Sequence, residues 1–145
     1  KKPKTFRILF LDRGVAGWAF LAESLGKRDF LERARYSFGS LHSPQELPPA
    51  LASFMTSEGL AVLGYRPAAT GLDFETLNEF DIVISLEAGL TDQIPRRPYH
   101  TVFLEWPLDE VAPSNELTEE NLGRVFSRLK TELTRLNSVI SGGEL

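Results

Sequence analysis

The sequence predicts an α/β domain of three layers, in which helices flank a four-stranded, mainly parallel sheet. The main reason is that short apolar, β-prone segments alternate along the chain with segments of helical periodicity, an order typical of parallel sheets. A second reason is length, because 145 residues is a common size for one domain with its own core. Residues 1–145 are therefore expected to form a single domain.

Four segments predict strands, at residues 5–11, 35–39, 81–86 and 101–104. The first reads Thr-Phe-Arg-Ile-Leu-Phe-Leu and the third reads Asp-Ile-Val-Ile-Ser-Leu. Such continuous apolar runs are typical of strands that are covered on both faces, as in parallel sheets with helices on either side.

Apolar residues at helical spacing predict a helix that starts at Trp18, and Leu31 leaves open its continuation past Gly26. A second helix is expected around residues 47–55, with Pro48 and Pro49 in its first turn and Gly59 as its stop. A short third helix is expected over 74–80, with Asp73 as its N-cap.

The last helix has the clearest pattern, because one face stays apolar for about five turns until Gly142 and Gly143 end it. The apolar stripe consists of Leu122, Val125, Phe126, Leu129, Leu133, Leu136 and Ile140. Between the third and fourth strands, Pro95 and Pro98 allow only a short helix within 87–100. The longest expected loop is 105–118.

Composition excludes several classes of function. The chain has no cysteine, which excludes disulfide scaffolds, thiolate metal sites and cysteine nucleophiles. Two histidines, His42 and His100, leave little for a metal site, and no cofactor is expected. The net charge of −4 argues against general nucleic-acid binding. No apolar stretch predicts a membrane span or a secretory signal, so a cytoplasmic location is expected.

The turn after the first strand is the natural place for a ligand in such a fold, because ligands bind beyond the carboxyl ends of parallel strands. Here the turn reads Asp-Arg-Gly-Val-Ala-Gly over residues 12–17. It lacks the Gly-Lys-Ser/Thr of a Walker loop and the third glycine of a dinucleotide fingerprint.

From the first turn onward, the chain resembles the low-molecular-weight protein tyrosine phosphatase family, whose fold is shared by one class of arsenate reductases. Matching features follow in order over nearly the whole chain, and the terminal helix fits as well. They are the strand Ile8–Leu11, then Leu21-Ala22-Glu23, Tyr36-Ser37-Phe38-Gly39-Ser40, Glu58-Gly59-Leu60 with Gly64-Tyr65-Arg66, and Asp81-Ile82-Val83-Ile84-Ser85-Leu86. The resemblance implies a phosphatase-like parallel sheet.

The family's catalytic signature, C-x5-R, is absent. The resemblance aligns Asp12 with the nucleophilic cysteine and Trp18 with the phosphate-binding arginine, while Gly14 is retained. A carboxylate at position 12 would repel a phosphate by about 1–4 kcal/mol at high effective dielectric. Arg13 is poorly placed to replace the arginine, and no Asp-Pro supplies the family's general acid. The family reaction is therefore not expected here.

Asp12 has three interpretations. It accepts hydrogen bonds from the loop amides as an internal substitute for the lost phosphate, or it acts as a carboxylate nucleophile, or it contacts a partner protein. The favoured function is that of an inactive pseudo-phosphatase that binds another protein or serves as an assembly or regulatory subunit. The alternatives are a phosphoryl-transfer enzyme that uses Asp12 and an anion-sensing domain.

A partner surface is expected around the first turn and the long loop. Its candidate residues are Trp18, Phe20, Trp106, Asp109 and Glu110. Aromatic residues are enriched at the centres of protein interfaces, which is the reason for including both tryptophans. One of Trp18 and Phe20 is expected to pack inward, and a partly exposed Trp18 is the alternative that would recognise a partner.

Overall fold

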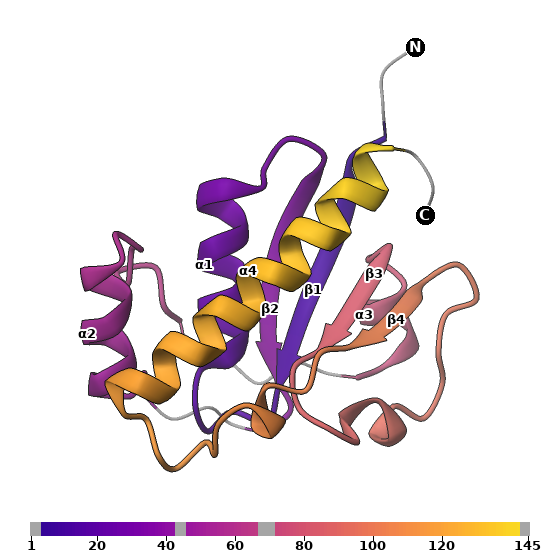
Figure 1. Ribbon diagram of the computed structural model, residues 1–145. Coiled ribbons are helices and arrows are strands. Elements are labelled where there is room, and N and C mark those ends of the chain that lie inside the picture. Colours follow the sequence, from indigo (N-terminus) through magenta and orange to yellow (C-terminus); the bar gives the residue numbers. More distant parts are fainter. Residues whose placement is uncertain (1–3, 43–45, 67–71, 143–145) are drawn as a thin grey trace.

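The computed structural model describes residues 4–42, 46–66 and 72–142. Its centre is a sheet of four parallel strands in the order β2-β1-β3-β4 (Figure 1). The strands are β1 (Phe6–Asp12), β2 (Ala34–Ser40), β3 (Ile82–Ser85) and β4 (Val102–Glu105). This arrangement confirms the predicted α/β class and the four-stranded parallel sheet.

Alternation along β1 divides the core into two parts, because successive strand side chains point to opposite faces of the sheet. Ile8 and Phe10 belong to the larger hydrophobic cluster, whereas Leu9 and Leu11 belong to the smaller one. All four side chains are buried, as expected for a strand that is covered on both faces.

The larger cluster packs β1 against three helices, α1 (Trp18–Asp29), α2 (Pro49–Ser57) and α4 (Glu119–Ser141). Figure 1 shows α4 crossing this face of the sheet. The smaller cluster includes Leu77 from α3 (Phe74–Leu77) and Leu90 from the 3₁₀ turn η1 (Leu90–Gln93). The two clusters therefore form on opposite sides of the sheet, which gives the predicted three layers.

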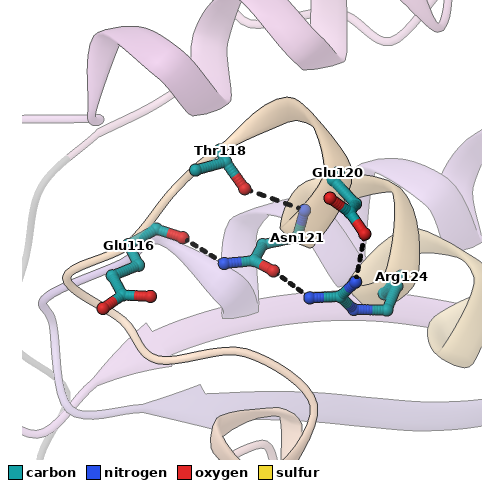
Figure 2. Close-up of polar contacts among 5 residues, drawn as sticks. All are labelled: Glu116, Thr118, Glu120, Asn121 and Arg124. Carbon is teal, nitrogen blue, oxygen red and sulfur yellow. Dashed lines mark hydrogen bonds and ion pairs between the residues drawn. The ribbon is translucent and has the colours of Figure 1, made fainter.

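The first residues of α4 connect the helix to the loop before it (Figure 2). Thr118 caps the helix, since its Oγ1 accepts the Asn121 N–H at 3.1 Å. The Asn121 Nδ2 donates to the Glu116 carbonyl at 2.8 Å, and its Oδ1 accepts from Arg124. Arg124 also pairs with Glu120 at 2.9 Å. This network fixes the end of the long loop.

Three elements differ from the sequence-based expectation. Helix α1 continues past Gly26 but ends at Asp29, because Phe30 leaves the helical conformation and packs on the core. Leu31 lies beyond the helix and is 44% exposed. Helix α3 ends at Leu77 instead of residue 80. The residues after Leu77 form tighter turns, and these turns place Asp81 where its N–H donates to the Arg7 carbonyl. The loop after β4 contains a 3₁₀ turn, η2 (Leu108–Glu110).

Among the residues that the structure describes, no helix is both long enough and apolar enough to cross a bilayer.

Candidate functional site

Asp12 is the last residue of β1, and its carboxylate is held by three donors from the surrounding chain. Its Oδ1 accepts the Gly14 N–H at 2.8 Å and the Ser40 hydroxyl at 2.6 Å. Its Oδ2 accepts the Ala19 N–H, in the first turn of α1, at 2.8 Å. The prediction that Asp12 accepts hydrogen bonds from the loop amides is confirmed.

The carboxylate is also removed from solvent, since Asp12 is only 2% exposed. Burial raises the pKa of Asp12 above its ordinary 3.8, because desolvation disfavours the charged form. The hydrogen bonds from Ser40, Ala19 and Gly14 act in the opposite direction and lower that pKa. Burial of the Asp12 carboxylate therefore costs free energy, and the three hydrogen bonds offset part of that cost by stabilising the ionised form.

Glycine is required at one position where the loop enters α1. Gly17 has a φ of 82°, in the left-handed region that other residues avoid. A Cβ on Gly17 would lie 2.9 Å from Leu51 Cδ2 and 3.0 Å from Leu47 Cδ1. A side chain at position 17 would therefore force the ends of Leu47 and Leu51 to move, in addition to straining the backbone.

The other wall of the loop comes from the end of β3. The Arg13 N–H donates to the Glu87 carboxylate, and the Arg13 guanidinium donates to the Ala88 carbonyl at 2.8 Å. Burial raises the pKa of Glu87, and the nearby charges of Asp12 and Asp109 act in the same direction. Arg13 is therefore engaged with the residues after β3, away from the Asp12 carboxylate.

Little space remains beside Asp12. The cavity at this position has a volume of about 10 Å³ and is bounded by residues of the loop, β2 and the segment before α2, together with Tyr65. That volume is about the minimum that a single water molecule needs. A phosphate or arsenate, with four oxygens around a central atom, is several times too large for it.

The aromatic residues of the predicted partner surface lie in the core. Trp18 is 0% exposed and Phe20 is 3% exposed, so the alternative of a partly exposed Trp18 is wrong. Phe20 packs edge-on against Phe38 and Tyr65, with ring centroids 5.2 and 5.1 Å away. Trp106 is 7% exposed and contacts Phe10 at a centroid distance of 6.0 Å.

The two acidic candidates of that surface are exposed, although Asp109 also has a structural role. Its carboxylate accepts the Ala88 N–H at 3.1 Å and so connects the turn η2 to the end of β3. Glu110 lies beside it in the same 3₁₀ turn. Of the residues predicted for the partner surface, only Asp109 and Glu110 are exposed.

Sequence reasoning named neither Ser40 nor Glu87 as a site residue. Both follow the same rule as Asp12, since Ser40 ends β2 and Glu87 lies just beyond β3, the two strands that flank β1. The carboxyl ends of neighbouring parallel strands converge, and this signal would have identified them once the strand order was known. No group of acidic, histidine or cysteine side chains within the described ranges could hold a metal ion.

Several solved structures have a fold similar to that of this chain. An arsenate reductase in a phosphate-binding state matches with a TM-score of 0.75 and 17% identity, covering 94% of this chain and 99% of that one. The YwlE arginine phosphatase from Geobacillus stearothermophilus matches with a TM-score of 0.72 and 15% identity, covering 96% and 95%.

A thioredoxin-dependent arsenate reductase from Corynebacterium glutamicum also matches, with a TM-score of 0.72 and 14% identity. That match covers 98% of this chain, which spans 64% of the length of the reductase. No protein-family model matches the sequence, and no curated protein matches it significantly. At these identities the likeness concerns the fold alone. The chain has the fold of the low-molecular-weight phosphatases and arsenate reductases but contains no cysteine, so the C-x5-R signature of that enzyme fold is absent.

Proposed function

We propose that this chain is a non-catalytic, phosphatase-like domain that acts by binding another protein, as an assembly or regulatory subunit. The observation that carries the proposal is the position of the Asp12 carboxylate. It accepts hydrogen bonds from Gly14, Ala19 and Ser40, so these three donors are occupied by the chain itself. These three donors are therefore not available to a bound anion.

Two further features support the lack of turnover. The space beside Asp12 is about 10 Å³, which leaves no room for a phosphoryl group. Trp18, which the family resemblance aligns with the phosphate-binding arginine, is fully buried and carries no charge. A guanidinium binds an oxyanion through paired, charge-assisted hydrogen bonds, and an indole cannot replace these.

The alternative of Asp12 as a nucleophile has less support. A nucleophilic carboxylate must reach phosphorus, yet this carboxylate is 2% exposed and both of its oxygens already accept hydrogen bonds. An anion-sensing role beside Asp12 would require space that the cavity of about 10 Å³ does not provide. A domain without turnover acts through its surface, where the exposed Asp109 and Glu110 are the remaining candidates for a partner contact.

Turnover of p-nitrophenyl phosphate across a range of pH values tests the absence of catalysis. We expect no turnover by the natural chain, and no chemical-shift changes around Gly14 and Ala19 when inorganic phosphate is added in an NMR titration. The Asp92→Asn variant, with a substitution at an exposed side chain of η1, is the matched control. Turnover that is lost in Asp12→Asn and kept in Asp92→Asn would overturn the proposal.

The protein-binding part of the proposal needs its own test once a partner has been captured. Charge reversal at Glu110, an exposed side chain of η2, is expected to weaken the complex while leaving the fold unchanged. Glu75→Arg, at an exposed side chain of helix α3, serves as the charge-matched control. Equal binding by both variants would remove η2 from the contact surface.

A further inference from the structure

We propose that β4 is the contact edge of a symmetric homodimer, in which the β4 strands of two copies pair antiparallel and join their sheets. Such a contact does not depend on whether the loop after β1 is catalytic. Strand β4 forms one end of the sheet, as Figure 1 shows. An edge strand presents unpaired backbone groups that can accept another strand.

The direction of these backbone groups follows from the bonds that β4 makes inward. Val102 and Trp106 donate their N–H groups to the carbonyls of Asp81 and Ser85, at 2.9 and 2.8 Å. Because strand residues alternate, the N–H and C=O groups of Phe103 and Glu105 point away from β3. No hydrogen bond to those groups comes from any residue in the described parts of the chain.

The opposite edge of the sheet is less suited to strand addition. On β2, the Arg35 guanidinium donates to the Ala34 carbonyl at 2.8 Å and so occupies a backbone acceptor of that strand. Strand β4 reads Val-Phe-Leu-Glu and contains neither the lysine nor the proline that commonly protects an exposed edge. Val102 is 38% exposed, and Tyr99 just before the strand is fully exposed.

A single register satisfies the outward groups of both copies. If the two-fold axis passes between the two Leu104 residues, Phe103 of each copy lies opposite Glu105 of the other. Residues that face each other in this way, with their backbone groups directed outward, exchange paired N–H to C=O hydrogen bonds. Such an isologous contact uses the same patch on both copies and closes after two subunits.

The side chains on the α4 side of the sheet are apolar in this register. An open groove of about 230 Å³ beside β4 is lined by Leu104, Trp106, Glu132, Arg135, Leu136 and Val139. The two Leu104 side chains would meet at the axis, where the facing residues of a non-hydrogen-bonded pair are closest. Each copy would therefore cover the apolar groove of the other.

The charges on the opposite face are complementary in the same register. The Arg97 guanidinium lies 5.4 Å from the centre of the Phe103 ring. Directly opposite Phe103, and on the same face of the sheet, lies the exposed Glu105 of the second copy. The arrangement therefore brings Arg97 of each copy to Glu105 of the other, and this complementarity favours a second copy over an unrelated strand.

Sedimentation equilibrium of the intact chain, from micromolar to submillimolar concentration, tests the proposal. We expect a concentration-dependent rise in mass from 16.2 kDa toward twice that value. The variant Glu105→Pro removes an outward N–H and the charge from an exposed edge position, where proline is tolerated, so it should remain monomeric. A natural chain that stays monomeric throughout overturns the proposal, even if it pairs with a strand of another protein.

A charge exchange then tests the register. Arg97→Glu and Glu105→Arg should each weaken the dimer by about tenfold, since the symmetric contact contains the pair twice. The double variant should recover most of that loss. The matched control is Arg96→Glu, because Arg96 stacks on Phe74 at 4.2 Å and not on Phe103. A dimer unaffected by Glu105→Pro and by both single charge changes would overturn the β4 contact.

Discussion

The Ser40 hydroxyl donates a hydrogen bond of 2.6 Å to the Asp12 carboxylate, although the two residues are 28 positions apart in the chain. Each residue is the last of its strand, and the two are direct partners in the parallel register of β1 and β2. The pairing of strand ends thus places a neutral donor beside a buried acid.

Ser40→Ala is expected to lower the free energy of unfolding by about 1–3 kcal/mol, because it leaves a buried charged acceptor with one donor fewer. The pKa of Asp12 should rise further, since the Ser40 hydrogen bond lowers it. Urea denaturation and carboxyl NMR titration would measure the two effects. Ser127→Ala, on the exposed side of α4, should change the unfolding free energy by less than about 0.5 kcal/mol.

The raised pKa of Asp12 predicts the sign of its contribution to stability across pH. The folded chain holds the Asp12 proton more tightly than the unfolded chain, whose pKa is near the ordinary 3.8. This contribution is fully present below pH 3.8 and is lost as pH rises through the higher folded pKa. The stability of the natural chain relative to Asp12→Asn should therefore fall as pH rises above 3.8.

Asp73 gives the opposite trend and serves as the control. Its hydrogen bonds with Thr76 lower the pKa of Asp73 below 3.8. Its contribution is present above that value and is lost as pH falls through the lower folded pKa, so stability relative to Asp73→Asn should increase with pH. Denaturation of the three proteins at matched pH values would measure both trends, and trends of the same sign would contradict this account.

Gly17→Ala should destabilise the fold by about 1–3 kcal/mol, because the position combines a left-handed backbone with a Cβ only 2.9 Å from Leu51 Cδ2. Gly123→Ala should act in the opposite direction. A Cβ at Gly123, inside α4, meets nothing within 4 Å, and alanine favours a helix over glycine by about 1 kcal/mol. Thermal denaturation of both variants would show whether the signs differ.

Asn121→Ala should lower the free energy of unfolding by about 1–3 kcal/mol, since it removes the side chain that joins the Glu116 carbonyl to Arg124 (Figure 2). Glu120→Ala removes only an ion pair whose carboxylate is 81% exposed, and should change stability by less than about 1 kcal/mol. Hydrogen exchange of the first turn of α4 would locate the effect. Equal losses in the two variants would contradict a special role for Asn121.

Much of this fold could be predicted from local pattern. The apolar runs of β1 and β3 and the stripe on α4 are repeated signals, and each corresponds to an element in the structure. The lengths of α1 and α3 are harder to predict from the sequence. Their ends depend on where Phe30 packs and on where Asp81 joins β1, and both are tertiary effects.

The site was predicted in part. The amide contacts of Asp12 followed from a carboxylate in a glycine-containing turn, which is a local relationship. The contact with Ser40 and the engagement of Arg13 by Glu87 depend on strands β2 and β3 lying on either side of β1, and spacing along the chain does not specify that order. The burial of Trp18 likewise depends on which face of α1 meets the sheet.

The Asp12 carboxylate is covalently part of the chain whose loop donors it satisfies, so its hydrogen bonds do not depend on the concentration of any free ligand. Binding of a free anion would stabilise a fold in proportion to the logarithm of the anion concentration. Here the donors of Gly14, Ala19 and Ser40 are satisfied at every concentration of phosphate in the surroundings. The order of the loop is thereby uncoupled from the concentration of anions in the surrounding solution.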